Sequence, residues 1–534
     1  MTDKKARYWS KRGGPEGPFD VIVIGSGMGG MTAAALMAKL GKKVLVLEQH
    51  YVPGGFTHAF KRKGYLWDVG VHAVGEVTGH SVTGRLLTAL TDGRLKWASL
   101  GEVYDEFYFP DGFRIDFPDS PRKFRENLLE AFPGEQAAID GYMAAVREVA
   151  GGMRGYYLAR TFPKQMGPVA DRLFGRGAQR FLKMRTADVI AELTDDPRLR
   201  TLLAAQWGYY GSPPSQSSFA IQALVVKHFS HGGYYPVGGS GAIATELLRT
   251  VAEAGGYTRI VADVDEILIE GGKAVGVTMT TGDVVRAPTV ISAAGVVSTI
   301  RRLLPEAHRS QPWADETQSL AAAPAHVCLY LGFKGDIRKA GAGPANKWFY
   351  NTWDHEAMTW PVRGEGPLPQ APCLYCSFPS LKDPEHDPGP EQRHTGEVVT
   401  FVPWEDFMEW KDSRWRKRGG DYEALKTKIE EALLAQFLEN MPELRGMLDY
   451  VELSTPLSTD WFCRPIAGSI YGIEPTPERF ENPWLRPRSP IPGLFFAGSE
   501  VATVGVIGAM MGGVLSAVAA EPVAAMSYLR QYAR

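Results

Sequence analysis

The segment from Asp20 to Glu48, DVIVIGSGMGGMTAAALMAKLGKKVLVLE, constrains the fold more than any other part of this chain. Its first apolar run, Val21–Ile24, has the composition of a strand that is buried on both faces of a parallel sheet. The glycine-rich run Gly25–Gly30 follows directly, and then come a helix rich in Ala, Leu and Met and a second apolar strand. This order of strand, turn, helix and strand is the context in which a G-x-G-x-x-G sequence binds a dinucleotide.

The glycines of this segment have separate roles. Gly25 makes the tight turn, Gly27 lets the backbone approach a pyrophosphate, and Gly30 lets the helix pack closely on the strand. The helix N-terminus then presents free N–H groups to the phosphates. Glu48 is placed to accept hydrogen bonds from a ribose diol, and its charge would repel a 2′-phosphate, which disfavours NADP. Glycine-rich turns also occur without a ligand, but the complete strand–helix–strand context favours dinucleotide binding.

The residues after Glu48 carry two further motifs. Gly54-Gly55-Phe56-Thr57 follows Glu48 after five residues, and the run from Gly64 to Gly70 reads GYLWDVG. The pattern E-x5-GG-x-T followed by G-x-x-[FW]-D-x-G resembles the flavin-dependent family of phytoene desaturases, carotenoid isomerases and retinol saturases, in which it marks FAD. The resemblance implies an α/β fold: a discontinuous Rossmann-type FAD-binding domain with an inserted α+β substrate domain, as in amine oxidases and phytoene desaturases.

Later segments resemble the same family, most closely its retinol saturase branch. By this resemblance, the run that begins at Gly232 returns the chain to the FAD domain, and the backbone of Val264 meets the adenine. The run from Pro492 to Glu500 resembles the C-terminal flavin motif of the family, which implies that Glu500 bonds the ribityl chain. The helix N-terminus near Val506 would face the isoalloxazine, where its dipole would stabilise negative charge on the reduced ring.

These motifs lie at opposite ends of the chain and converge on one ligand, so together they predict a single FAD site. The predicted cofactor-binding residues are Gly25, Ser26, Gly27, Met28, Gly29, Gly30, Glu48, Gln49, Gly54, Gly55, Phe56, Thr57, Val71, Val264, Ala293, Gly295, Gly498, Glu500, Gly505, Val506 and Ala509.

The chain has 534 residues, which is too long for one ordinary core. We therefore expect an FAD-binding domain made of residues 18–99, 229–304 and 481–534, a substrate domain made of residues 100–228 and 305–480, and a flexible leader over residues 1–17. The net charge of −2 predicts no general attraction to nucleic acid. Four cysteines in so long a chain favour a reducing compartment, and hence the cytoplasm.

Several local patterns predict particular elements. Aromatic runs around Pro110-Asp111-Gly112 predict a hairpin. Residues 121–149 have helical periodicity with a break at Phe132-Pro133-Gly134, and residues 259–270 predict one strand. Cys373 and Cys376 form a CxxC without a second pair at zinc spacing, so a strand is predicted there rather than a metal site. Residues 501–520 carry no charge and could span a bilayer, but their place behind the flavin motif favours a buried helix.

Residues 154–185 contain eight Lys or Arg and one acid, interleaved with aromatic and aliphatic residues. Such a basic amphipathic stretch suits the surface of an anionic membrane. A helical cap with a solvated basic face is an equally consistent interpretation. A hydrophobic polyene would need a route out of a bilayer, which favours peripheral membrane contact by a cytoplasmic protein.

The chemistry follows from the expected flavin, which carries electrons while the protein orients a substrate against it. A second strand–GxGxxG–helix unit for a nicotinamide is missing, so we expect electrons to come from an unidentified donor: a partner, a transient donor or the substrate itself. The spacing of His50, His58, His72 and His80 fits no single helix face, so no metal site is predicted.

The leading hypothesis is a saturase that reduces a carbon–carbon double bond of a hydrophobic polyene such as a retinoid or carotenoid. His72 is the candidate catalytic residue, because Asp68-Val69-Gly70-Val71-His72 resembles the saturase motif; a purely structural histidine is the alternative. The same fold also serves cis–trans isomerisation and desaturation, between which the fold cannot choose. Amine oxidation and a non-catalytic flavoprotein are the further alternatives.

Overall fold

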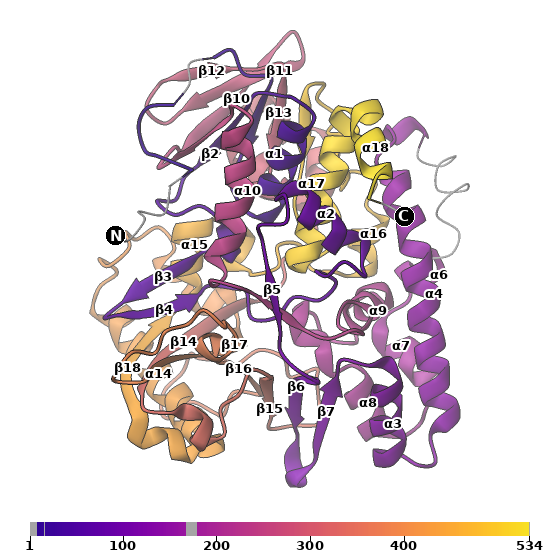
Figure 1. The fold of residues 1–534 in the computed structure, drawn as a ribbon, viewed down its shortest axis with the longest axis vertical. Helices are drawn as coiled ribbons and strands as arrows, with labels where there is room; N and C mark the ends of the chain where they lie inside the picture. The colour runs from indigo at the N-terminus through magenta and orange to yellow at the C-terminus, as the bar shows by residue number, and fades with distance from the viewer. Residues whose placement is uncertain (1–7, 15–16, 167–178, 533–534) are drawn as a thin grey trace.

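The computed structural model describes residues 8–14, 17–166 and 179–532. Five parallel strands form one sheet in the order β19-β13-β1-β2-β9. They come from three separate parts of the chain: β1 Val21–Ile24 and β2 Val44–Glu48, then β9 Tyr257–Ile260 and β13 Thr289–Ser292, and finally β19 Leu494–Phe496. This sheet lies in the upper half of the molecule (Figure 1). The predicted discontinuous α/β fold is confirmed.

The predicted strand–helix–strand unit consists of β1, α1 (Met28–Lys39) and β2. Val21 pairs with Val44 and Ile24 with Leu47 in parallel register, and both strands are buried along their whole length. Helices α10 (Gly241–Glu253) and α17 (Gly505–Ala520) share one apolar core with α1. Burial on both faces explains why these strands are continuous apolar runs rather than alternating ones.

Helix α17 confirms the prediction of a buried helix in the uncharged segment 501–520. Its glycines allow α17 to pack closely against α1 and against the turn at Gly498. A Cβ atom on Gly513 would lie 2.2 Å from the carbonyl oxygen of Gly29 in α1, and one on Gly512 would lie 2.0 Å from the carbonyl oxygen of Gly498. Within the described residues, we find no helix whose length and hydropathy would suit a bilayer span.

A three-stranded antiparallel sheet flanks the parallel one. It contains β10 (Val264–Glu270), β11 (Lys273–Met279) and β12 (Val284–Arg286) in sequence order. The prediction of one strand over residues 259–270 is wrong, because β9 ends at Ile260 and joins the parallel sheet whereas β10 belongs to the antiparallel one. Val261 separates them with a φ of 52°, a left-handed conformation that a strand cannot contain.

The lower half of the molecule is built on a seven-stranded mixed sheet in the order β18-β14-β17-β16-β15-β6-β7. Both segments of the predicted substrate domain contribute strands to it. They are β6 Val103–Tyr108, β7 Arg114–Pro118, β14 Ala325–Lys334, β15 Asn346–Tyr350, β16 Cys373–Ser377, β17 Arg393–Val402 and β18 Leu448–Ser454. The antiparallel pairing of β6 with β7 confirms the predicted hairpin, and buried β16 confirms the strand at the CxxC.

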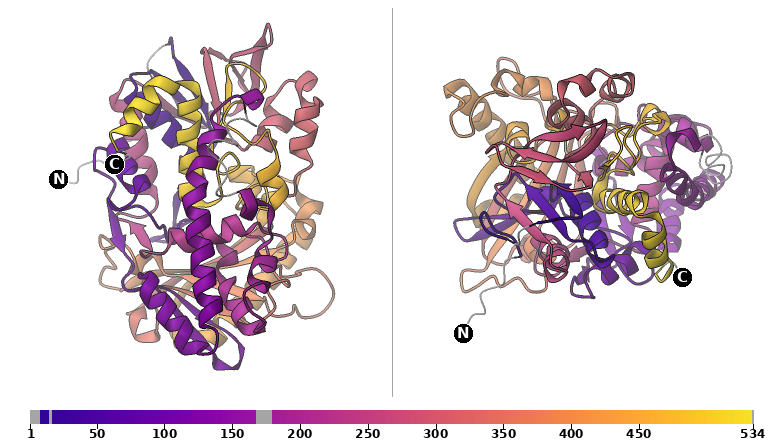
Figure 2. Two further views of the ribbon diagram at one scale, coloured as in Figure 1. Left: turned by 90° about the vertical axis from the view of Figure 1, so that its right-hand side faces the viewer. Right: turned by 90° about the horizontal axis from the view of Figure 1, so that it is seen from above.

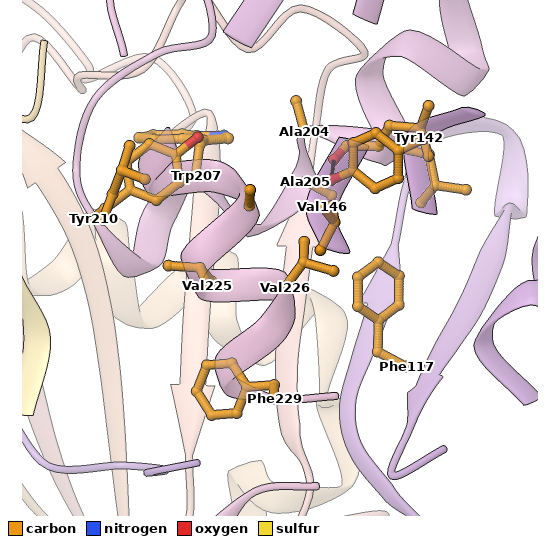
Figure 3. Packing of buried hydrophobic residues seen from close by; sticks show 14 of the residues in the cluster. Phe117, Tyr142, Val146, Ala204, Ala205, Trp207, Tyr210, Val225, Val226 and Phe229 are labelled. Atoms are coloured by element: carbon orange, nitrogen blue, oxygen red, sulfur yellow. Dashed lines mark hydrogen bonds between the residues drawn. The ribbon is translucent and has the colours of Figure 1, made fainter. Parts of the chain in front are cut away.

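A helical layer covers one side of this sheet. Helices α3 (Pro121–Ala131) and α4 (Gln136–Arg160) are separated at the predicted Phe132-Pro133-Gly134 break, and α4 is the long helix in the left panel of Figure 2. The other helices of the layer are α6 Gln179–Lys183, α7 Thr186–Ala191, α8 Pro197–Leu203 and α9 Phe219–His228. Figure 3 shows Val225 and Val226 of α9 inside this core, with Phe117 of the hairpin nearby.

The other described strands and α-helices connect or cover these two halves. They are β3 Ala59–Arg62, β4 Tyr65–Asp68, β5 Trp97–Ser99, β8 Tyr234–Pro236, α2 Val82–Leu90, α11 Val296–Ser298, α12 Glu306–Arg309, α13 Pro312–Gln318, α14 Gly420–Asn440, α15 Pro456–Cys463, α16 Pro477–Glu481 and α18 Pro522–Arg530. The longest of them, α14, packs on the seven-stranded sheet. Strands β3 and β4 pair with each other, as do β5 and β8. The pair β5–β8 joins two parts of the chain that are far apart in sequence.

Two expectations about surface segments change. Part of the expected leader is not free, because the N–H of Ser10 donates to the carbonyl of Thr258 (3.2 Å) and the N–H of Ile260 donates back to Ser10 (3.0 Å). Residues 1–7, 15 and 16 of that leader lie outside the described residues, as do residues 167–178 of the basic stretch. Within the described part of that stretch, Arg160 points inward, and its guanidinium donates to the carbonyl of Asn482 at 2.7 Å.

Candidate active site

A cavity of about 500 Å³ lies where the carboxyl ends of the parallel strands meet the N-termini of two helices. Gly25 follows β1, Glu48 ends β2 and Ala293 follows β13, and all three line it. The first turns of α1 and α17 line it as well. Neither helix has a side-chain cap on its first N–H groups, so both present free donors and the positive end of the helix dipole.

The glycines at this edge of the sheet do two different things. A Cβ atom on Gly30 would lie 2.1 Å from the carbonyl oxygen of Gly25, so Gly30 serves helix–strand packing. A Cβ atom on Gly27 would meet no protein atom within 4 Å, and the same is true of Gly498 and Gly505. Gly27, Gly498 and Gly505 therefore border open space that a ligand can approach closely.

Glu48 is held by the protein at the edge of this cavity. Its Oε2 accepts hydrogen bonds from the N–H (2.8 Å) and the hydroxyl (2.6 Å) of Ser26, and its Oε1 accepts one from the N–H of His50 (2.7 Å). A carboxylate has about four lone-pair sites, so one remains for a further donor. The other acid, Glu500, is buried, and its Oε2 accepts from the N–H of Val296 (2.5 Å) at the start of α11.

The structure brings most of the predicted cofactor residues together. Those that line the cavity are Gly25, Gly27, Met28, Gly29, Glu48, Gln49, Gly55, Phe56, Thr57, Val264, Ala293, Gly295, Gly498, Glu500, Gly505, Val506 and Ala509. Ser26, Gly30, Gly54 and Val71 lie behind this wall instead. Ser26 bridges Glu48 and the N–H of Gly54 (3.1 Å), and Val71 is part of the apolar core, so these four support the wall through contacts with protein.

The same cavity continues into an apolar compartment beside the seven-stranded sheet. Its walls are large aromatic and aliphatic side chains from α9, from β15 to β17, and from the loops before α9 and after α15. They include Tyr209, Ile221, Leu224, Val225, Trp348, Tyr375, Phe401, Ile470 and Tyr471. An enclosed wall of this kind suits a hydrophobic ligand, because burial of its apolar surface drives binding.

His72 also lines the cavity, where it meets the apolar compartment. Its ring lies edge-on to the ring of Tyr375, with 5.1 Å between centroids. Its Nδ1 is 2.8 Å from Oε2 of Glu397, whose side chain is completely buried on β17. Burial and the charge of Lys382 lower the pKa of His72 to about 3, whereas burial raises the pKa of Glu397 to about 8. Burial therefore favours the neutral form of both groups, the uncharged imidazole and the protonated carboxyl group.

Lys382 is a buried cation that interacts with both members of this pair. Its buried ammonium group donates to the carbonyl of His72 (2.6 Å), to Oδ1 of Asn346 (2.5 Å) and to the hydroxyl of Ser377 (2.7 Å). Burial lowers the pKa of Lys382 to about 8. Its three donor groups are thus all used, and the loop after η7 (Pro379–Leu381) is tied to the backbone of the candidate catalytic histidine.

Comparison with known proteins places this site in a family. The family model for flavin-containing amine oxidoreductases matches residues 28–520. An all-trans-retinol 13,14-reductase from Danio rerio is 33% identical over 92% of this chain and 84% of its own length, and a prolycopene isomerase from Daucus carota is 24% identical over 82% and 69%. An oxidoreductase structure from Methanosarcina mazei superposes with a TM-score of 0.62 at 15% identity, covering 92% of this chain and 98% of that one, which shows the fold alone.

This chain belongs to the flavin-containing amine oxidoreductase family. It is an oxidoreductase, and its cofactor is FAD. The resemblance inferred from the sequence motifs is thereby confirmed. The cavity described above fits this cofactor. Glycines border open space next to α1 and next to α17, and the uncapped N-termini of these two helices supply N–H donors for the phosphates and the ring. The roles assigned to single cofactor residues stay predictions.

The sequence analysis of this flavoenzyme did not identify four residues that lie in or near the cavity. Arg302 and Arg464 line the cofactor end, and the guanidinium of Arg464 pairs with the carboxylate of Asp263 at 2.8 Å and 3.0 Å. Glu397 and Lys382 lie behind His72. The only sequence signal for Glu397 is an acid within a strand-like apolar run, and Lys382 stands in a turn-like segment that gives no hint of burial.

The raised pKa of Glu397 predicts how stability depends on pH. The folded protein holds this proton up to about pH 8, whereas an unfolded glutamate loses it near pH 4.5. The stability that protonation contributes is therefore fully present below about pH 4.5 and is lost as pH rises through about 8. We expect the free energy of unfolding of the wild type relative to E397Q to fall across this range in urea titrations. A difference that does not change with pH would contradict the assignment.

Proposed function

We propose that this flavoenzyme reduces one carbon–carbon double bond of a hydrophobic polyene of the retinoid class. The observation that carries the proposal is the apolar compartment with aromatic walls that continues directly from the cofactor cradle. The likeness to retinol 13,14-reductases over almost the whole chain supports the same substrate class. Bound FAD, once reduced, supplies a hydride to one carbon of the double bond. The apolar walls hold the polyene and exclude water, and His72 faces the compartment as the group that exchanges a proton.

Redox-neutral cis–trans isomerisation of a carotenoid is the second candidate. The likeness to prolycopene isomerases, at 24–26% identity, favours it over amine oxidation. The two candidates differ in whether electrons leave the flavin. Reduction consumes the reduced cofactor with each turnover, whereas isomerisation leaves its oxidation state unchanged.

An anaerobic experiment on the purified protein separates these functions. The bound flavin is reduced, all-trans-retinol is added, and the absorbance of flavin and polyene is recorded together. Reduction of a double bond shortens the conjugated system, so we expect the flavin to reoxidise while the polyene band moves to shorter wavelength. A polyene change without flavin reoxidation would identify an isomerase. A second assay, in air with amines, tests the remaining alternatives. Formation of hydrogen peroxide would identify an amine oxidase, and no change with retinol or with amines would support a non-catalytic flavoprotein.

The source of electrons is also a proposal. The sequence carries one strand–GxGxxG–helix unit, which FAD would occupy. We infer that a reductant other than a nicotinamide, protein or small molecule, reduces the flavin between turnovers. Oxidation of NADPH by the isolated protein at a rate that matches polyene turnover would contradict this inference.

Peripheral membrane contact is proposed for the surface around residues 154–185. Within its described part, Met166 is 51% exposed, and the side chains of Arg180 and Lys183 are 66% and 65% exposed. Their ion pairs with Glu192 and Glu481 are surface pairs of small energy, so both charges remain available to anionic headgroups. We expect the protein to co-sediment with anionic vesicles more than with neutral ones. R180E/K183E should weaken this binding, and equal binding to both vesicle types would contradict the proposal.

A further inference from the structure

His72 and Glu397 meet only in the folded chain. His72 follows β4 in the segment that leads into the cavity, whereas Glu397 lies in the middle of β17. The N–H of Asp68 donates to Oε1 of Glu397 at 2.8 Å, which directs the other oxygen, Oε2, toward Nδ1 of His72. The glutamate side chain is fully buried and that of His72 is 11% exposed, so contact with the cavity runs through the histidine.

The short distance between these two atoms favours a shared proton. Oε2 and Nδ1 are 2.8 Å apart, although they are not aligned as a hydrogen bond in this structure, and within the described residues neither atom has another aligned partner. Two atoms that offered only lone pairs would repel each other at this distance, so the contact favours one hydrogen between them. Among the described residues, no hydrogen bond to Nε2 of His72 is found, which leaves this second ring nitrogen for the cavity.

The charges around the pair indicate how many protons it holds. The buried carboxyl groups of Asp68, Asp105 and Glu397 all interact with the buried ammonium group of Lys382. Asp68 accepts hydrogen bonds from the hydroxyl of Tyr235 and the N–H of Ser240, as expected for an ionised carboxylate.

Asp105 similarly accepts from the hydroxyl of Tyr209 (2.8 Å) and the amide of Asn346 (2.8 Å). With both aspartates ionised, one lysine cannot also balance an ionised Glu397. Other titratable side chains near the pair are His326, Cys328 and Tyr330 on β14 and Tyr375 on β16. Burial lowers the pKa of His326 to about 4 and raises the pKa values of Cys328, Tyr330 and Tyr375, so all four are neutral at neutral pH.

We propose that Glu397 and His72 form a proton relay that protonates the polyene during its reduction. This inference rests on the proposed function. The N–H bond at Nε2 of His72 breaks as a new C–H bond forms at one carbon of the double bond. At the same time Nδ1 takes the proton of Glu397, whose O–H bond breaks, so the histidine stays neutral and the glutamate becomes a carboxylate.

Bound FAD, in its reduced form, would supply the second hydrogen with its electron pair to the neighbouring carbon. The double bond thus gains two hydrogens and two electrons. The nearby ammonium group of Lys382 stabilises the new carboxylate. Water in the cavity then protonates Nε2 of His72, and the proton on Nδ1 returns to Glu397, which restores the starting state. In this scheme His72 touches the reacting carbon, and Glu397 acts through it.

The experiment compares wild type, E397Q, E397D and the control E106Q. Glu106 lies on β6 of the same sheet, and its Oε2 is 2.5 Å from Nζ of Lys347. Neither residue lines the cavity, so replacing Glu106 should leave turnover unchanged. Single turnover of anaerobically reduced enzyme with all-trans-retinol is followed against pH. General acid catalysis typically contributes about 10²–10⁴-fold, so we expect E397Q to slow flavin reoxidation by about 100-fold or more. Retinol affinity and flavin content should stay unchanged.

The pH profile and an infrared spectrum report on the proton itself. The wild-type rate should fall as pH rises past the point where Glu397 loses its proton, E397Q should lose this alkaline limb, and E397D should recover part of the rate. In the oxidised protein without substrate, the carbonyl band of a protonated carboxylic acid should shift in D2O and be weaker in E397Q but not in E106Q.

The outcomes separate the relay from the proposed function. If the wild type reduces retinol and E397Q keeps both its rate and its alkaline limb, the relay is wrong although the function stands. An infrared band that is unchanged in E397Q would also overturn it, because the proton would then reside elsewhere. If the wild type turns over no polyene at all, the proposed function itself has failed.

Discussion

Replacing Gly30 with alanine is expected to abolish FAD binding and to destabilise the fold. The new Cβ atom would lie 2.1 Å from the carbonyl oxygen of Gly25 and 3.0 Å from the Cβ atom of Ala293. Overpacking usually costs about 1–3 kcal/mol when side chains can adjust. Here the atom in the way is backbone at the end of β1, so α1 must move off the sheet and we expect the loss to reach or exceed that range. Flavin absorbance of the purified protein and its melting temperature measure both effects.

Gly27→Ala is the matched control, because the same methyl group is added in a different place. Its Cβ atom meets no protein atom within 4 Å, so the melting temperature without cofactor should stay close to that of the wild type. The methyl group would instead occupy space that the cofactor needs, and flavin content should fall. If G30A and G27A behaved alike in the absence of flavin, the packing role of Gly30 would be refuted.

Replacing Lys382 with methionine is expected to destabilise the protein by about 3–5 kcal/mol, the usual cost of removing one partner from a buried charge cluster. The ammonium group donates to three oxygens, and its loss leaves Asn346, Ser377 and the carbonyl of His72 without these donors. It also leaves the buried carboxylates Asp68 and Asp105 without a nearby cation. Urea unfolding at neutral pH gives the free energy directly.

Lys123→Met provides the comparison at the surface. Lys123 pairs with Glu102 at 3.0 Å, but the two side chains are 43% and 80% exposed, so its removal should cost far less stability than the removal of Lys382. A Lys382 variant that loses no more stability than this control would mean that water reaches the cluster behind His72. The relay proposed above would then lack its dry environment.

The cofactor half of this protein can be predicted from local sequence because its elements are contiguous. Strand β1, the glycine turn and α1 form one uninterrupted segment, and their apolar and glycine positions follow from burial on both faces and from close packing. Residues 501–520 are likewise predictable as a buried helix. The strand predicted over residues 259–270 failed because a left-handed residue, Val261, divides two strands of similar composition between different sheets.

The surroundings of the substrate depend on contacts between distant segments. His72 could be selected from its motif, yet nothing in the sequence pairs it with Glu397, 325 residues later, or with Lys382. The aspartates near them also lie on separate strands, β4 and β6. Each of these side chains is ordinary in its own segment, and its unusual proton affinity arises only from burial beside the others.

The sequence alone thus determined the family, the cofactor and the parallel-sheet framework, because each depends on motifs in which neighbouring residues act together. The tertiary structure decided which groups support the histidine, where the apolar compartment lies, and which predicted cofactor residues line the cavity rather than stand behind it. The physical reason is that desolvation and charge pairing depend on distance in space, and local sequence patterns contain no information about which strands become neighbours in a mixed sheet.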